Sequence, residues 1–308
     1  MSNNGVSAPY FHPYVARHET FPPRYGWLKK GYDAVLQDNL IFEGERAIEI
    51  LGVGANMVRA IRFWVCAFGL VESTLSEWPK RLTGPMKPTP FGEKLLSDDG
   101  WDPYLEDPAS LWLLHWKLFV SNVRAISWSL LMNLDYYGPF DSKSLNKTLK
   151  AKTAEMPELK RYAASSINSD TSCFLRMYTA SRSINSEEIE CPFTQLALIS
   201  YDAENEEYQF DRSLKKGLPD LILLSCCLNY SHISSPNSRT ISTRKLAYDI
   251  NSPGQVFKMS ENDLAWKLER AANLFDGVSV IDSYGTLQLQ FELDPVVLET
   301  AVLEHYYS

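Results

Sequence analysis

Apolar residues recur at helical spacing between Glu45 and Phe68, in two runs separated by the turn Gly52-Val53-Gly54. Glycine enters the left-handed conformation without a Cβ penalty, so one helix can end in this turn and another can begin after it. The pattern predicts a helix-turn-helix, with Gly69 ending the second helix. The inward positions of the two helices are Ala47, Ile48, Leu51, Val58, Ile61, Val65 and Phe68.

The outer face of the second helix carries side chains that suit DNA. If this helix packs on its Val58 face, Asn56, Arg59 and Phe63 point outward, with Arg62 beside them. An amide and guanidinium groups at the start of an exposed helix can contact base edges and phosphates in a major groove. The alternative is an αα-hairpin in the core of a helical domain, with no role in binding.

Residues 11–33 interleave aromatic and basic side chains around Pro22-Pro23, which predicts an extended arm followed by a helix from Trp27 to Gln37. We expect the basic side chains to line a phosphate-binding surface on which the aromatic rings stack against bases. Packing of these rings onto the first domain is the alternative, and both can hold. The basic residues of the arm are Arg17, His18, Arg24, Lys29 and Lys30.

A β-hairpin is predicted after the second helix. Val71–Leu75 forms its first strand, Trp78–Pro88 a loop, and Thr89–Leu96 a return with a short helix. A hairpin that follows a recognition helix is a wing, so residues 24–97 are interpreted as a winged helix-turn-helix; a solvated loop is the alternative. The basic residues expected at the tip of the wing are Lys80, Arg81 and Lys87.

Carboxylates are concentrated in residues 97–108. Oxygen ligands hold the magnesium or manganese ion that activates water in many phosphodiesterases, so Asp99 and Asp102 are candidate metal ligands and candidate catalytic groups. Turn and capping chemistry is the alternative, with Asp107 as the cap of the next helix. The other catalytic candidates, beside the basic arm, are His18 and Glu19.

The remaining chain predicts one long helix and two further modules. Leu111–Leu134 is apolar enough for a continuous central helix. Residues 140–185 predict a second helix-turn-helix-like module, in which Ser169 caps the last helix and Lys160, Arg161 and Arg176 lie on the surface.

The expected fold class is therefore mainly α with small β-hairpins (α+β), with tandem winged-helix or helix-turn-helix modules around the long central helix. Residues 1–23 are the N-terminal arm, 24–97 the winged helix-turn-helix, 98–139 the acidic loop and central helix, 140–185 the second helix-turn-helix-like module, and 186–308 a C-terminal α+β winged-helix-like domain.

Composition and charge narrow the class of protein. The chain has 308 residues, 45% of them hydrophobic and 22% charged, which is typical of a globular protein of two or three small domains. The net charge of −8 opposes DNA binding, but a local basic face is what binds phosphate, and basic residues gather between residues 143 and 182. There is no apolar run of membrane-spanning length, no secretion signal and no CxxC among the five cysteines, so buried reduced thiols in a cytoplasmic protein are expected.

Motifs along nearly the whole chain resemble one family. They are HETFPPRYGWLKKGYDAV, LGVGANMVRAIRFW, PTPFGEKLL, GWDPYLEDPASLWLLHWKL, SCFLRMY and SPGQVFKM. The sequence resembles the SspB-like family, a bacterial family long described as a domain of unknown function, whose members occur beside sulfur-transfer genes of DNA phosphorothioation. The resemblance implies a protein that nicks DNA so that sulfur can replace a non-bridging phosphate oxygen. It supplies no catalytic motif that can be carried over residue by residue.

Two hypotheses follow. The first is a DNA-binding component of an anti-phage phosphorothioation system, which nicks double-stranded DNA with magnesium or manganese and acts with sulfur-transfer and ATP-using proteins of the same gene cluster. The second is a non-enzymatic winged-helix regulator or scaffold for a sulfur-transfer enzyme, because no HNH, GIY-YIG, relaxase or PD-ExK pattern is present. Formation of a homodimer is left open. The predicted DNA-binding residues are Arg24, Lys29, Lys30, Asn56, Arg59, Arg62, Lys80, Arg81, Lys160, Arg161 and Arg176.

Overall fold

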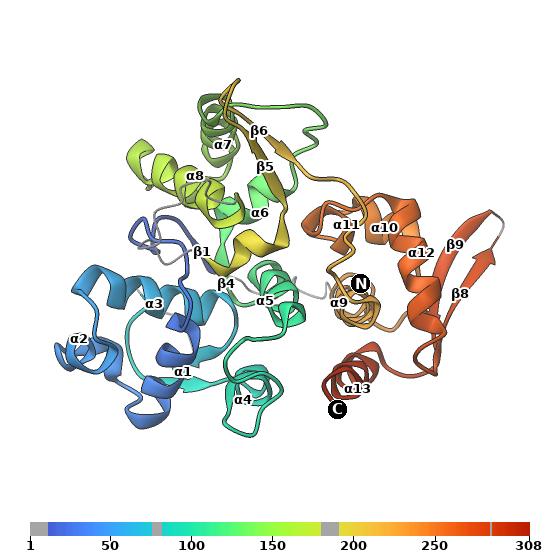
Figure 1. Ribbon diagram of the computed structural model, residues 1–308, viewed down its shortest axis with the longest axis horizontal. Coiled ribbons are helices and arrows are strands. Elements are labelled where there is room, and N and C mark those ends of the chain that lie inside the picture. Colours follow the sequence, from blue (N-terminus) through green and yellow to red (C-terminus); the bar gives the residue numbers. More distant parts are fainter. Residues whose placement is uncertain (1–11, 76–81, 180–190, 284) are drawn as a thin grey trace, which may run out of the picture. The chain divides into compact units, whose positions relative to one another are not determined.

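The computed structural model describes residues 12–75, 82–179, 191–283 and 285–308. The chain folds into two compact units and passes between them several times. Both units are mainly helical with small sheets (Figure 1), which confirms the predicted α+β class. Unit 1 comprises Met1–Tyr104, Lys117–Ser129 and Asn146–Phe174, and unit 2 comprises Leu105–Trp116, Leu130–Leu145 and Leu175–Ser308.

The first helices of unit 1 follow the predicted pattern (Figure 1). They are α1 (Trp27–Gln37), the short η1 (Ile41–Glu43), α2 (Arg46–Leu51) and α3 (Ala55–Ala67). The bounds of α1 are those predicted, and α2 ends at Gly52, whose φ of 62° is left-handed. Val58, Ile61, Val65 and Phe68 are all buried, so the inward face of the second helix is also confirmed.

Two predictions about these helices are wrong. Ile48 is 41% exposed, so α2 packs through Ala47 and Leu51 only. Phe63, predicted on the outer face of α3, is 1% exposed. Its ring lies 4.9 Å from that of Trp64 and 6.1 Å from that of His18, because the N-terminal segment covers this side of α3. A helix covered on more than one side does not show a single apolar stripe.

The predicted hairpin and short helix after α3 are present. They are β2 (Val71–Ser73), the antiparallel β3 (Met86–Pro88), which lies within the predicted loop, and α4 (Pro90–Leu96). Thr89 caps α4 by accepting a hydrogen bond from the N–H of Gly92 (2.9 Å). A Cβ at Gly92 would lie 2.0 Å from the carbonyl oxygen of Leu70, so the packing of α4 on the hairpin requires glycine at this position.

The single helix predicted over Leu111–Leu134 is wrong. The chain instead forms α5 (Pro108–Val120), β4 (Val123–Ala125) and α6 (Ile126–Met132). A continuous apolar run does not reveal where one helix ends and the next begins. At the end of α5, the hydroxyl of Ser121 donates to the carbonyl oxygen of Ala67 (2.7 Å). β4 then pairs in parallel with β1 (His12–Tyr14), which fixes the N-terminal segment within unit 1.

The basic stretch forms α7 (Ser142–Glu155), η2 (Pro157–Leu159) and α8 (Ala164–Tyr178). The part from Asn146 to Phe174 belongs to unit 1. Ser169 does not cap the last helix as predicted, because α8 begins five residues earlier, at Ala164. One face of α8 is buried, and its side chains are Thr171, Phe174, Leu175 and Tyr178.

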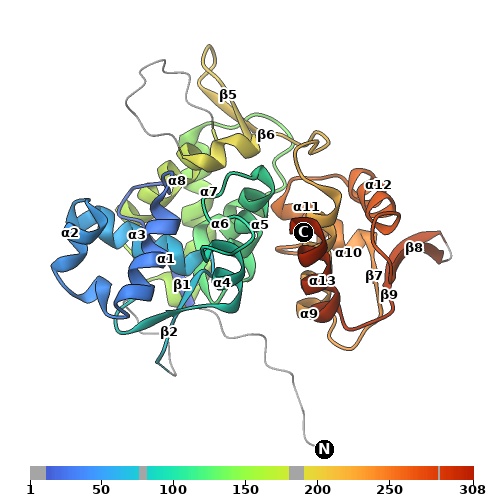
Figure 2. The same cartoon turned by 60° about the horizontal axis from the view of Figure 1, so that its bottom comes forward.

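Unit 2 packs helices against two small sheets (Figure 2). Its elements from residue 191 onward are η3 (Pro192–Leu196), β5 (Ile199–Asp202), β6 (Glu207–Phe210), α9 (Asp220–Ser234), β7 (Thr240–Ser242), α10 (Thr243–Tyr248), α11 (Pro253–Val256), α12 (Glu261–Ala272), β8 (Val278–Ser283), β9 (Thr286–Phe291) and α13 (Pro295–Tyr307). The antiparallel pair β5 and β6 is one sheet, and the other has the strand order β7–β9–β8. Helix α9 lies along α13.

All five cysteines are buried with free thiols, as predicted. Within the described ranges, no helix combines the length and the apolar character needed to cross a membrane.

Candidate anion-binding site

A strained segment at the start of unit 1 positions the candidate site. We call residues 14–21 the N-terminal strap. Three of its non-glycine residues are left-handed: Ala16 (φ 56°), Glu19 (φ 49°) and Thr20 (φ 70°). Such conformations cost on the order of 1–3 kcal/mol each, so they persist only where surrounding contacts impose them.

The buried carboxylate of Asp170, on α8, supplies these contacts. Its Oδ1 accepts hydrogen bonds from the Ala16 N–H and from Nε2 of His18, both at 2.8 Å, and its Oδ2 accepts one from the hydroxyl of Ser127. Nδ1 of His18 accepts the N–H of Thr20 at 3.1 Å, and this pattern assigns the ring proton to Nε2. His18, Ser127 and Asp170 are each at most 1% exposed, so the predicted catalytic candidate His18 lies in the interior of unit 1.

Aromatic rings enclose the imidazole of His18. The ring of Trp64 stacks on it at 5.9 Å, and the ring of Trp128 meets it edge-on at 5.5 Å. The indole N–H of Trp64 also donates to the carbonyl oxygen of Phe21 (2.9 Å), at the other end of the strap. The strap is therefore held by hydrogen bonds at both ends. The imidazole of His18 is enclosed, so neither of its nitrogens faces solvent, where a substrate could reach it.

Three arginines gather where the strap meets α3, and we call Arg17, Arg59 and Arg62 the arginine cluster. Nε of Arg59 lies 3.3 Å from Oε1 of Glu19, and Arg59 also donates to the side chain of Asn56. Burial lowers the pKa of Arg62, and the charges of Arg59 and Arg17 lower it further, whereas Glu43, 3.5 Å away, raises it. The guanidinium groups of Arg59 and Arg17 therefore both lie within electrostatic reach of Arg62.

The predicted basic residues of the arm are partly neutralised. Nζ of Lys29 lies 2.8 Å from Asp33 and 2.9 Å from Asp98, and these carboxylates raise its pKa although partial burial, the largest effect, lowers it. The guanidinium of Arg24 stacks over the rings of Phe21 and Trp27, at 5.7 and 5.4 Å. Lys30 is exposed.

The expected wing is only partly described. Lys87 pairs with Glu72 across β2 and β3, with Nζ 3.2 Å from Oε1. Lys80 and Arg81 lie outside the described residues.

Helix α7 and the segment after it carry lysines that, unlike Lys29 and Lys87, have no carboxylate partner among the described residues. We call Lys147, Lys150, Lys152 and Lys160 the lysine group. Among the residues that the structure describes, none of the four has a carboxylate within salt-bridge distance. Arg161, next in the chain, donates to the hydroxyl of Tyr162 (3.2 Å), and its charge lowers the pKa of Tyr14 on the strap against the stronger effect of burial, which raises that pKa to about 12. Arg176, on α8 in unit 2, is exposed.

The acidic segment does not form a ready metal site. Asp98 pairs with Lys29, Asp102 is only 7% exposed, and Asp99 is exposed. Asp107 accepts the N–H of Ala109 (2.8 Å), as predicted for the cap of α5. No group of three His, Cys, Asp or Glu side chains in the described ranges is placed to hold an ion, so these residues do not fit a preformed magnesium or manganese centre.

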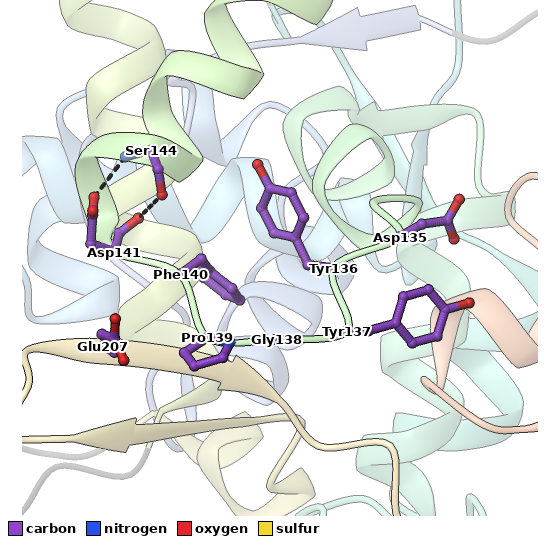
Figure 3. A pocket seen from close by; sticks show the side chains of 9 residues that line it. All are labelled: Asp135, Tyr136, Tyr137, Gly138, Pro139, Phe140, Asp141, Ser144 and Glu207. Carbon is purple, nitrogen blue, oxygen red and sulfur yellow. Dashed lines mark hydrogen bonds between the residues drawn. The ribbon is translucent and has the colours of Figure 1, made fainter.

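A pocket of about 390 Å³ in unit 2 was not predicted from the sequence (Figure 3). Asp141, at one end of it, caps α7 by accepting the N–H of Ser144 (2.7 Å). The guanidinium of Arg212 lies 4.2 Å from the ring centre of Tyr137, and its Nε has no hydrogen-bond partner among the described residues. The lining residues are Asp135, Tyr136, Tyr137, Gly138, Pro139, Phe140, Asp141, Ser144 and Glu207.

A buried amine lies beside the chain segment that leads into this pocket. Lys258 is 0% exposed, and its Nζ donates to the carbonyl oxygens of Met132 (2.5 Å) and Leu134 (3.1 Å). Burial and the charge of Arg212 lower its pKa from 10.5 to about 7, although Asp135 opposes the shift. Because the side chain is fully enclosed, its role is to tie the α6–α7 connection to α11 rather than to contact a ligand.

Sequence reasoning missed Asp170 and Ser127 altogether. Asp170 contacts His18 across a sequence separation of 152 residues and Ser127 across one of 43 residues, and neither Asp170 nor Ser127 stands in a motif. The structure does bring together Glu19, Asn56, Arg59 and Arg62, which were proposed for two different roles, and it leaves Asp99 and Asp102 apart from them on the segment after α4.

The chain is similar to known proteins over nearly its whole length. Residues 15–307 match the family described as "Protein of unknown function (DUF4007)". The "SspB crystal structure" superposes with a TM-score of 0.87 and 32% sequence identity, covering 97% of this chain and 89% of that one. The "Magnesium ion-bound SspB crystal structure" gives a TM-score of 0.88 and 32% identity, covering 99% and 90%. No curated protein matches the chain in sequence.

The amine of Lys258 predicts how the stability of unit 2 depends on pH. Its pKa in the folded state, about 7, lies below the usual 10.5, so the folded protein binds fewer protons than the unfolded chain between these values. The contribution of Lys258 to the free energy of unfolding should therefore rise with pH across this window. Urea unfolding at several pH values should give a more positive slope of the free energy of unfolding against pH in the wild type and in the control Lys216→Met than in Lys258→Met; equal slopes in all three would contradict the assignment.

Proposed function

Because this chain belongs to the DUF4007 family, and shares 32% of its sequence with SspB over nearly its full length, we propose that it is the DNA-binding component of a bacterial DNA phosphorothioation system. The motifs that resemble the SspB-like family are spread along the whole chain. The similarity is therefore not confined to one segment, which supports a role in common with that family. The proposal includes sulfur-transfer and ATP-using proteins of the same gene cluster as partners, and a cytoplasmic location.

The charge pattern of unit 1 carries the DNA-binding part of the proposal. The chain has a net charge of −8, yet the lysine group has no carboxylate partner among the described residues. Unpaired lysines on an acidic protein are the local basic surface that phosphates attract. Arg59 and Lys29, by contrast, are already paired with carboxylates. The lysine group is therefore the first contact that we assign to DNA, and Arg161 extends it toward the strap.

The element order of unit 1 also supports a winged-helix interpretation. Three helices, α1, α2 and α3, are followed by the antiparallel pair β2 and β3, which is the order of helices and wing in that class of domain. Asn56 and Arg59 lie in the first turns of α3, where a recognition helix meets base edges. Under this proposal α3 approaches DNA after the lysine group has attracted its backbone.

Strand nicking is the enzymatic part of the proposal. One of the two similar SspB structures is magnesium ion-bound, which supports metal-dependent chemistry, and the exposed Asp99 is the carboxylate we favour on this chain. The competing function is a non-enzymatic scaffold for a sulfur-transfer enzyme. It is supported by the lack of a preformed cluster of metal ligands in the described ranges and by the burial of His18.

A triple variant of the lysine group tests the DNA-binding proposal. Lys147→Gln/Lys150→Gln/Lys160→Gln should weaken binding to duplex DNA at least tenfold at low salt. The slope of log affinity against log salt concentration should flatten by about 0.9 for each lost phosphate contact. The matched control removes three exposed positive charges from unit 2, as Lys216→Gln/Arg239→Gln/Arg244→Gln. If both variants weaken binding equally, the surface is not where we place it.

A plasmid assay separates the nickase from the scaffold. Pure wild-type protein with magnesium or manganese should convert supercoiled DNA to open circles, and Asp99→Ala should lose this activity while it still binds DNA. Asp102→Asn tests the second predicted metal ligand. The control is Glu72→Gln, which removes a carboxylate from a surface pair with Lys87. Binding without conversion under any metal would favour the scaffold, and full activity in Asp99→Ala would remove this residue from the site.

A further inference from the structure

We propose that the arginine cluster is a binding site for one phosphate of the DNA backbone, and that the carboxylate of Glu19 occupies this site in the free protein. This inference rests on the proposed DNA binding. It adds that a carboxylate of the protein itself competes with DNA for the arginine cluster. Glu19 was a catalytic candidate from the sequence, and the structure assigns it a different role.

The contact between Glu19 and Arg59 is the starting point. Nε of Arg59 lies 3.3 Å from Oε1 of Glu19, and the two side chains are 46% and 30% exposed for Arg59 and Glu19 respectively. Carboxylate and phosphate oxygens are interchangeable partners of a guanidinium group, since both accept its N–H donors in the same plane. The position of the Glu19 carboxylate is therefore a position that a phosphate can take, and it is open to solvent.

The surroundings hold more positive charge than Glu19 neutralises. Arg59 and Arg17 both lie close enough to Arg62 for their charges to lower its pKa, while Glu43 is the other carboxylate paired with the cluster in the described part of the chain. Nε of Arg17 is buried and has no hydrogen-bond partner among the described residues. A backbone phosphate can take the place of Glu19 because its two non-bridging oxygens accept the same N–H donors as a carboxylate, at a site that keeps a net positive charge.

The side chain of Glu19 can move away from Arg59 while the backbone of the strap stays folded. Its neighbours His18 and Ala16 are held by Asp170, and Phe21 is held by Trp64, so the backbone on both sides stays fixed. Only the partly exposed side chain of Glu19 has to rotate away. Ion pairs of this exposure are weak, so a phosphate of bound DNA can replace the carboxylate.

Removing the carboxylate of Glu19 is the direct test. Glu19→Gln should bind a fluorescein-labelled DNA duplex about twofold to fivefold more tightly than the wild type, because a surface ion pair no longer competes. The plot of log affinity against log salt should become steeper by up to about one, as one more counterion is released. The control is Asp249→Asn, which removes one carboxylate from an exposed pair with Lys245 in unit 2 and should leave both quantities unchanged.

A double-mutant cycle shows whether the effect acts through Arg59. In an Arg59→Gln background, Glu19→Gln should no longer tighten binding, because the guanidinium that it frees is absent. Thermal unfolding of each variant confirms that the strap remains folded. If the wild type binds DNA and Glu19→Gln behaves like Asp249→Asn, or if the gain survives in Arg59→Gln, the inference is overturned and the DNA-binding proposal stands. If neither the wild type nor Glu19→Gln binds DNA, the proposed function itself fails.

Discussion

The hydrogen bonds of the Asp170 carboxylate are the constraint on which the rest of unit 1 depends. One buried side chain on α8 holds the strap through Ala16 and His18 and holds α6 through Ser127. Three left-handed residues in the strap show that its path is imposed by these contacts rather than by local preference. The position of Glu19 against α3, and so the net charge of the surface around the arginine cluster, follows from this anchor.

Pairing of charges, rather than their number, distinguishes the surfaces of this acidic protein. Arg59, Arg62 and Lys29, which were predicted from the sequence to contact DNA, have carboxylate partners. The lysine group, of which only Lys160 was predicted to contact DNA, has none among the described residues. Unpaired charges act at a distance and set the rate of encounter, whereas paired charges must first be released and so favour a specific complex. Under the proposed function, this difference predicts a two-step approach to DNA, first by lysines and then by arginines.

Local structure could be predicted where the sequence contains a strong local signal. The bounds of α1, the turn at Gly52 and the inward face of α3 all follow from glycine positions and helical periodicity. The break between α5 and α6 could not be found, because the run is apolar throughout and is interrupted by a pairing with β1, more than a hundred residues earlier in the chain. Phe63 was placed outside for the same reason, since the strap that covers it is remote in sequence.

The candidate site could be predicted only in its parts. The residue types that suit phosphate were recognisable in the arm and in the second helix of the hairpin, but their partners were not. The contact between Glu19 and Arg59 and the burial of His18 against Asp170 both depend on tertiary packing. Composition counts Arg59 as a positive charge that is available to bind phosphate, but in the folded protein the carboxylate of Glu19 lies beside it and neutralises that charge.

The most direct test of the central claim, that DNA contacts unit 1 through the lysine group, is a lysine-reactivity footprint. The protein is acetylated with and without duplex DNA, and the modified lysines are quantified by mass spectrometry. We expect Lys147 and Lys160 to become protected when DNA is bound, while Lys216 and Lys245 of unit 2 react equally in both states. Bound DNA that leaves Lys147 and Lys160 fully reactive would contradict it.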